Sequence, residues 1–232
     1  SIVLLFSITL FLVFEGLDAY SINNIPIYWL GVTFLISVFV GIQFLGFKVS
    51  SYNFVPIRNW VFYGVFITLF QSLFNDIVLP KYASTSYVQY ISLRLLRLIF
   101  FLVVIYCLDY ILKKYSFEHI LSFFLISSLF ISILSLISYF SYVYGYSDFP
   151  RSRPGSGGWT QPIERACNIL RNYGTFREPS FLAIWTVPFL PYFFYMGKTK
   201  KIWYVLSTIP ILSIVLSRSL TGVIAFLLAS FI

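Results

Sequence analysis

Long apolar runs separated by short polar segments dominate this chain. Runs of roughly 18–22 apolar residues recur along it, and a helix needs about 20 such residues to cross a bilayer core of about 30 Å. The pattern therefore predicts an all-α fold, a polytopic transmembrane helical bundle of about eight spans. We predict helices over residues 1–14, 27–47, 57–74, 87–108, 119–143, 180–197, 201–216 and 219–232. The first and last runs are shorter than a full span, so we expect them to be truncated helices.

Composition supports a membrane protein and excludes an ordinary soluble domain. Of the 232 residues 59% are hydrophobic and only 10% are charged, with a mean hydropathy of +0.87. Soluble domains carry about 25% charged residues. The net charge of +8 does not indicate a nucleic-acid partner, because the charges lie between predicted spans and form no basic groove.

The short loops predict the orientation. Seven lysines and arginines fall in one alternating set of loops, 48–58, 109–118 and 197–201. The other set contains two, in loops 15–26, 75–86 and 217–219. The positive-inside rule places the first set in the cytoplasm. The chain then divides into N-terminal membrane helices (1–147), an external loop (148–179) and further membrane helices (180–232).

The external loop gathers five arginines and no lysine: Arg151, Arg153, Arg165, Arg171 and Arg177. Lysine solvates a loop equally well, whereas arginine adds a planar, permanently charged fork that binds phosphate through two hydrogen bonds. The use of arginine without lysine predicts an anionic or polar substrate at the membrane edge. Within the loop we expect an interfacial helix over 163–171 that ends at Gly174, and we expect Pro179 to open the next span.

Arg171 and Arg218 are the strongest candidates, because the predicted topology puts both at the same membrane face. Arg218 lies in a turn of only about three residues and so stays at the interface. The alternative is that these side chains only reach lipid headgroups. Arg94 and Arg97 share one face of the fourth predicted helix, where they either line a chamber or pair with an acid near the helix ends, Asp76 or Asp109.

Two segments carry a resemblance to a known family. The sequence RNYGTFREPSFLA at 171–183 resembles the segment that leads into a membrane helix in bacterial oligosaccharide repeat-unit polymerases of the Wzy type. The related O-antigen ligases have a similar segment, often with Asn where Glu178 stands. The sequence LSRSLTG at 216–222 resembles the Ser-Arg-x-x-x-Gly segment that both families place two helices later.

The resemblance implies a GT-C-like membrane glycosyltransferase at the outer face of the bacterial inner membrane. Its partners would be an undecaprenyl-pyrophosphate-linked oligosaccharide, membrane lipid and a chain-length regulator, and it would use no cofactor and no metal. A hydroxyl of one lipid-linked repeat would attack the anomeric carbon of the growing chain, and undecaprenyl pyrophosphate would leave. The alternatives are an O-antigen ligase, a flippase or other transporter of lipid-linked oligosaccharides, and a membrane assembly protein without chemistry.

The implied site residues follow from the same segments. Arg171 and Arg218 would stabilise the departing pyrophosphate, and Glu178 would orient an arginine or accept the hydroxyl proton. Glu178-Pro179 is also an ordinary helix start, with the acid favoured by the helix dipole. The general base would otherwise lie beyond Ile232. The substrate-binding residues would be Arg177, Arg153, Arg165, Arg94, Arg97, Gly174 and Ser180.

Overall fold

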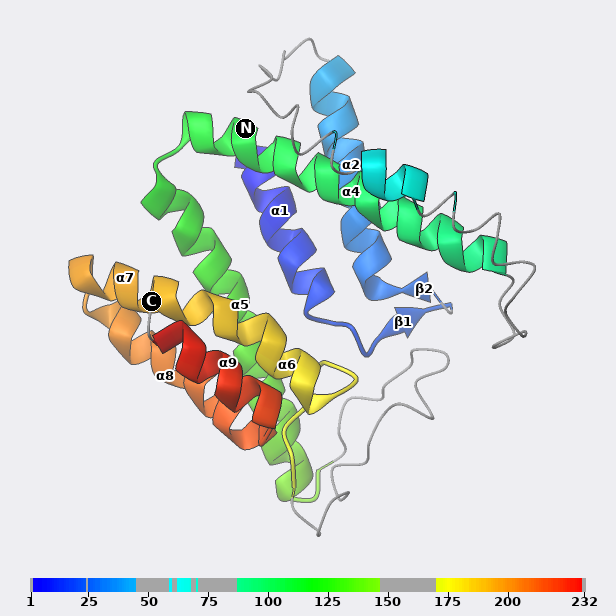
Figure 1. The fold of residues 1–232 in the computed structure, drawn as a ribbon. Helices are drawn as coiled ribbons and strands as arrows, with labels where there is room; N and C mark the ends of the chain where they lie inside the picture. The colour runs from blue at the N-terminus through cyan, green and yellow to red at the C-terminus, as the bar shows by residue number, and fades with distance from the viewer. Residues whose placement is uncertain are drawn as a thin grey trace. The chain divides into compact units, whose positions relative to one another are not determined.

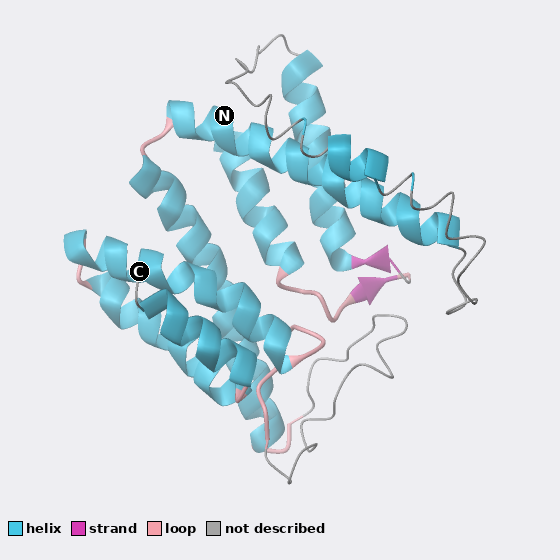
Figure 2. Cartoon of the chain, in the orientation of Figure 1, coloured by secondary structure: helices cyan, strands magenta, loops and turns pink. Residues whose placement is uncertain are grey.

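Helices make up most of the structure, which is a computed structural model. It describes residues 2–23, 25–44, 87–146 and 170–230, with short helical pieces between residues 59 and 70. The sheet within this part of the chain is one two-stranded hairpin. Figure 1 shows the helices in chain order, and Figure 2 shows the hairpin between the first two of them.

The apolar runs form the helices that the sequence predicts. Five helices begin and end within about three residues of the predicted bounds, which is near the usual uncertainty of helix ends. They are α1 (Ile2–Glu15), α2 (Ile27–Phe44), α5 (Phe117–Val143), α8 (Ile202–Ser217) and α9 (Leu220–Ser230). The predicted span 57–74 lies mostly outside the described residues.

Two of the predicted loops are wrong in part. Helix α4 (Tyr87–Lys114) continues six residues past its predicted end, into the loop predicted over 109–118. Asp109 and Lys113 lie one turn apart there and form an ion pair of 2.8 Å, which favours continued helix. The predicted loop 15–26 contains the hairpin of β1 (Ser21–Ile22) and β2 (Ile25–Pro26), whose turn includes Asn23 at φ +50°.

The sixth predicted helix is divided in three. Helix α6 (Pro179–Thr186) leads into the 3₁₀ segment η2 (Val187–Phe189) and then into α7 (Leu190–Thr199). Pro188 lacks the backbone N–H that would continue the α-helical ladder, so the ladder tightens at this point. The α-helical hydrogen-bond ladder is therefore interrupted at Pro188. Pro210, in contrast, lies inside α8 without ending it.

Within the described part of the chain, three helical runs are long and apolar enough to cross a membrane: α2, α5 and the run Pro179–Thr199. Helices α1 and α8 are equally apolar but shorter. These lengths and compositions indicate an all-α membrane protein. The number of eight spans and the GT-C-like arrangement stay predictions.

The chain forms two compact units, Ser1–Leu35 with Tyr115–Ile232, and Ile36–Lys114. In the first unit α5 packs against α1 on one side and against α8 on another, while α6 and α7 pack on α8, and α9 packs on α6 (Figure 1). Its main core joins α5, α6, α7 and α8 through Leu121, Leu125, Leu129, Ala183, Val187, Leu190, Phe193, Met196, Trp203 and Ile214. The second unit contains the rest of α2 and all of α4.

Candidate functional site

The polar segment 170–178, called here the 170–178 loop, is the centre of the candidate site. Its middle residues, Asn172 to Phe176, are buried although they belong to no helix or strand. Buried backbone outside regular structure needs hydrogen-bond partners. The loop finds them in the α8–α9 corner at one end and in the turn after α1 at the other. It therefore ties three distant parts of the sequence together.

A closed ring of hydrogen bonds fixes the first half of the loop. Asn172 is 1% exposed, and its side-chain NH₂ donates to the Ser213 hydroxyl at 3.3 Å. The Ser213 hydroxyl donates to Ser135 Oγ at 3.2 Å, and the Ser135 hydroxyl donates back to Asn172 Oδ1 at 3.0 Å. Each group donates once and accepts once within the ring, so these buried polar atoms are mutually satisfied. The ring joins the loop to α5 and α8.

Gly174 lets the loop lie directly on α5. Its φ is +47°, a left-handed conformation that glycine adopts without a steric penalty. A Cβ atom at this position would overlap the Ser135 side chain and would lie 2.7 Å from the Ser135 Cα. The structure thus gives Gly174 a packing role. Its predicted part in substrate binding stays a prediction.

Arg171 lies at the C-terminal end of α8. Its Nε donates to the Ser217 carbonyl at 3.2 Å and one terminal nitrogen donates to the Arg218 carbonyl at 3.4 Å. The Asn172 N–H also donates to the Leu216 carbonyl at 2.8 Å. Terminal helix carbonyls lack partners within the helix and carry partial negative charge, so a guanidinium is favourable here. Arg171 and Arg218, predicted to share one membrane face, lie at one corner of the fold.

Arg218 forms the corner between α8 and α9 in a left-handed conformation. Its φ and ψ are 47° and 36°, and its side chain is exposed. Its side chain makes no hydrogen bond or ion pair with the described residues. The left-handed conformation costs a residue with a Cβ atom about 1–2 kcal/mol, so glycine or asparagine would be the ordinary choice at this position. The chain keeps an arginine here in spite of that cost.

The residues that follow Arg218 start α9. The Ser219 hydroxyl accepts the Gly222 N–H at 3.3 Å, which is the N-cap arrangement. Gly222 itself faces Ala183 on α6, and a Cβ on Gly222 would overlap the Ala183 methyl group. The Ser-Arg-Ser-x-x-Gly pattern thus sets a sharp corner and close packing of α9 on α6.

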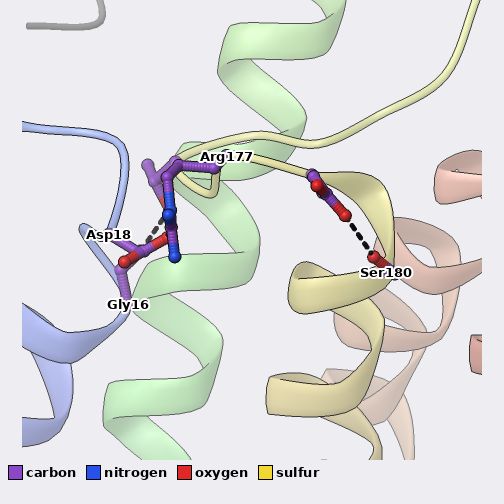
Figure 3. A network of polar contacts seen from close by, with 6 residues as sticks. Gly16, Asp18, Arg177 and Ser180 are labelled. Atoms are coloured by element: carbon purple, nitrogen blue, oxygen red, sulfur yellow. Dashed lines mark hydrogen bonds and ion pairs between the residues drawn. The ribbon is translucent and has the colours of Figure 1, made fainter. Parts of the chain in front are cut away.

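The second half of the loop is held by the turn after α1. The Thr175 hydroxyl donates to the Gly16 carbonyl at 2.6 Å, and the Ala19 N–H donates to the Thr175 carbonyl at 3.0 Å. Arg177 pairs with Asp18, Nε to Oδ2, at 2.6 Å (Figure 3). Because this carboxylate already neutralises much of its charge, Arg177 is less suited than Arg218 to hold a free anion.

Glu178 is the N-cap residue of α6, and Pro179 occupies the first turn as predicted. The Ser180 hydroxyl donates to Glu178 Oε2 at 3.1 Å (Figure 3). The carboxylate is thereby oriented at the positive end of the helix. This geometry fits the helix-start reading of Glu178-Pro179, and the proton-accepting role stays a prediction.

The other predicted site residues lie apart from this loop or beyond the described chain. Arg153, Arg165 and most of the predicted interfacial helix 163–171 fall outside the described residues, and residues 170 and 171 are not helical. Arg94 and Arg97 lie in α4, but their side chains are also outside what the structure describes.

Comparisons of the chain with protein-family models, curated proteins and solved structures found no match. The residues of the site must therefore carry the functional argument.

Sequence reasoning missed three residues of this site: Asn172, Ser213 and Asp18. In the sequence, Asn172 lies between Arg171 and Arg177, and Ser213 lies in an apolar run. A signal for Asp18 was present, because it is one of only eight acids in the chain and lies in a short loop. Its partner could not be read from the sequence, since Arg177 is 159 residues away.

Proposed function

We propose that this protein is a membrane glycosyltransferase that polymerises undecaprenyl-pyrophosphate-linked oligosaccharide repeat units. It works as a GT-C-like helical bundle at the outer face of the bacterial inner membrane, with the 148–179 loop outside. The proposal rests on the resemblance of segments 171–183 and 216–222 to the Wzy-type polymerases.

The observation that supports it most directly is the meeting of Arg171 and Arg218. Forty-seven residues separate them, yet Arg171 donates to the backbone carbonyl of Arg218 itself. Arg218 presents an exposed guanidinium beside the N-terminus of α9, where the helix dipole is positive. Two guanidinium groups and a helix N-terminus at one corner favour a multiply charged anion. A pyrophosphate group has the required charge.

The proposed reaction requires positive charge beside the bond between the anomeric carbon and the pyrophosphate. The acceptor hydroxyl oxygen bonds to the anomeric carbon of the growing chain, and the bond from that carbon to the pyrophosphate oxygen breaks. The leaving pyrophosphate keeps the electron pair, while the hydroxyl proton passes to a base. Negative charge on the leaving group rises toward the transition state, so fixed guanidinium groups stabilise the transition state more than the ground state.

The two arginines have different parts in this proposal. Arg171 also caps α8, so its removal loosens the corner as well as removing a charge. Arg218 makes no side-chain hydrogen bond to the described residues, so its guanidinium is expected to serve the substrate. Glu178 and Ser180 keep the start of α6 in place.

The test uses the full-length gene in its host, with the surface glycan resolved on a gel. The informative variant is Arg218→Gly, because glycine relieves the left-handed strain while it removes the guanidinium. We expect normal protein in the membrane but a glycan ladder reduced about 100-fold or more, the usual effect of losing one transition-state donor. Arg218→Lys keeps the charge without the fork and should fall between Arg218→Gly and wild type.

Arg171→Ala is tested in parallel with Arg218→Gly, and Lys201→Ala is the matched control. Lys201 lies at the other end of α8, so this variant removes one positive charge from the same helix. A single repeat left on the core means that polymerisation is lost while transfer to the core survives, as proposed. Accumulation of lipid-linked polymer with no glycan on the core would instead identify a ligase. A normal ladder in Arg218→Gly would refute the proposed role of this corner.

A further inference from the structure

Two buried serine hydroxyls on α5 have no hydrogen-bond partner in the described part of the chain. Ser128 and Ser132 are both 0% exposed, and neither hydroxyl oxygen makes a hydrogen bond to a described residue. A buried hydroxyl without a partner destabilises the fold, because it has lost its hydrogen bonds to solvent. Native proteins contain few such groups, and an ordered water molecule often satisfies them. The two hydroxyls therefore mark a place in the bundle that requires a polar partner.

Both hydroxyls lie on the face of α5 that packs against α8. Ser128, Ser132 and Ser135 are four and three residues apart, which places them on one face of the helix. Ser135 accepts a hydrogen bond from Ser213 on α8 at 3.2 Å. Leu129, next to Ser128, belongs to the core that α5 shares with α7 and α8. The two hydroxyls thus extend the polar ring below the 170–178 loop by about two helical turns into the bundle.

Helices α5 and α8 run in the same direction. At the start of α5, the Phe117 ring lies 6.2 Å from the ring of Tyr195, in the last turns of α7 just before α8 begins. Toward the other end of α5, Ser135 contacts Ser213 in the last turns of α8. Equal steps back from that contact therefore reach the same depth on the two helices.

A proline in α8 lies at the depth of the two hydroxyls. Three residues back from the contact are Ser132 on α5 and Pro210 on α8, which is buried. Ile133 and Ile209 line a single groove, as this alignment of the helices requires. Proline has no N–H, so the carbonyl of Leu206, four residues earlier, lacks its α-helical partner. Helix carbonyls point toward the C-terminus, so this acceptor points toward the level of Ser132.

We propose that a buried water molecule binds between α5 and α8 at this level. The hydroxyls of Ser128 and Ser132 donate to its oxygen, and the water donates to the Leu206 carbonyl. About three hydrogen bonds are usual for a buried water. Ordered water and serine side chains are among the groups that compensate for a proline in a membrane helix. The water links the proline of α8 to α5, and this assignment is independent of the proposed polymerase activity.

The first experiment compares alanine variants of the purified full chain, unfolded in mixed micelles by a graded denaturing detergent. Ser128→Ala and Ser132→Ala each remove one hydroxyl of the site. Ser122→Ala is the matched control, because its hydroxyl bonds the Glu118 carbonyl of the same helix at 2.8 Å and all three variants gain the same helix propensity. Relative to this control, we expect the unfolding equilibrium constant of each variant to rise about fivefold, the equivalent of one hydrogen bond. If both variants are at least as stable as the control, the hydroxyls have no partner and the proposal is wrong.

Combined variants test whether a single water serves all three groups. Because both hydroxyls bind the same water, the effects of Ser128→Ala and Ser132→Ala should be less than additive in the double variant. Pro210→Ala returns an N–H to the Leu206 carbonyl, so Ser132→Ala should destabilise this background less than the wild type. Additive effects would mean separate partners, and an unchanged effect in the Pro210→Ala background would mean that the Leu206 carbonyl is not involved. Either result would overturn the assignment.

X-ray footprinting identifies the partner as water. Irradiation converts a bound water into a hydroxyl radical that oxidises neighbouring side chains, and Leu125, one turn before Ser128 and Leu129, is 0% exposed to outside solvent. We expect oxidation of Leu125 in the wild type and its loss in the double variant of Ser128→Ala and Ser132→Ala. A wild type without oxidation at Leu125, or equal oxidation in both proteins, would refute a water at this position.

Discussion

Replacing Gly174 with alanine tests whether the 170–178 loop is held as tightly as the structure indicates. The added methyl group meets two separate obstacles. The backbone is in the left-handed region at φ +47°, and the new Cβ would overlap Ser135, whose Cα lies 2.7 Å away. The Ser135 Cα is part of α5, so it cannot move without bending that helix. The loop must therefore shift, and the Asn172 ring must shift with it.

The two obstacles have separate magnitudes. A residue with a Cβ atom in the left-handed conformation costs about 1–2 kcal/mol. Overpacking a tight contact by one methyl group costs a further 1–3 kcal/mol or so. Alanine also lowers the entropy of the unfolded chain, which offsets about 0.4–1 kcal/mol of this destabilisation. The expected loss of unfolding free energy is therefore about 1–5 kcal/mol.

Gly145→Ala separates the two obstacles. Gly145 follows α5 with φ +75°, and no atom lies within 4 Å of a Cβ built on it. Its alanine variant shares the backbone strain and the unfolded-state term but has no overlap. Both variants would be unfolded in mixed micelles by a graded denaturing detergent, with the free energy of unfolding taken from each transition. We expect Gly174→Ala to be less stable than Gly145→Ala by the overpacking term, about 1–3 kcal/mol.

A third variant confirms which atoms collide. Ser135→Gly removes the side chain that overlaps the new methyl group, although it also breaks the hydrogen-bonded ring. In a double-mutant cycle it should therefore cost less in the Gly174→Ala background than in the wild type. Equal stability of Gly174→Ala and Gly145→Ala would refute the reasoning, because the loop would then not lie on α5.

Two further substitutions test the hydrogen bonds around the same corner. Asn172→Ala opens the buried ring with Ser135 and Ser213. It should lower the unfolding free energy by about 2–4 kcal/mol, because each lost hydrogen bond costs about 1 kcal/mol and the missing side chain leaves a cavity. The same micelle titration measures this loss. Ser219→Ala removes the N-cap of α9 and should cost about 1 kcal/mol, whereas Ser219→Asp should restore most of it. A loss below about 0.5 kcal/mol in Asn172→Ala would mean that the ring is not formed.

Arg171 both carries a charge and caps the end of α8, so a change in the activity of its variant can have two causes. Its guanidinium donates to two carbonyls at the end of α8, so Arg171→Ala changes both the charge and the corner. A loss of activity in that variant has two physical explanations. A loss of activity in Arg218→Gly has one explanation, the loss of the guanidinium, because glycine is at least as favourable as arginine at a left-handed position. Arg218 is therefore the residue on which the proposed function depends.

The sequence by itself was sufficient to predict most of the described helices. Apolar runs of membrane length have few alternatives, since a backbone without water must satisfy its own hydrogen bonds, and the observed helices follow the predicted ones closely. The break at Pro188 and the start of α6 at Pro179 were also predictable, because proline acts through its own ring and missing N–H. The extension of α4 to Lys114 was not, because lysine and aspartate are common both in loops and at helix ends.

Only the tertiary structure decided what the polar residues do. Arg171 and Arg218 could be assigned to one face from the predicted topology, but their direct contact depends on how α8 packs against the 170–178 loop. The pairing of Arg177 with Asp18 and the ring of Asn172, Ser135 and Ser213 join residues between 37 and 159 positions apart. Helix formation is set by neighbouring residues, whereas a buried hydrogen bond requires donor and acceptor within about 3 Å after the whole chain has folded. Local pattern therefore determined the helices, and long-range packing determined the site.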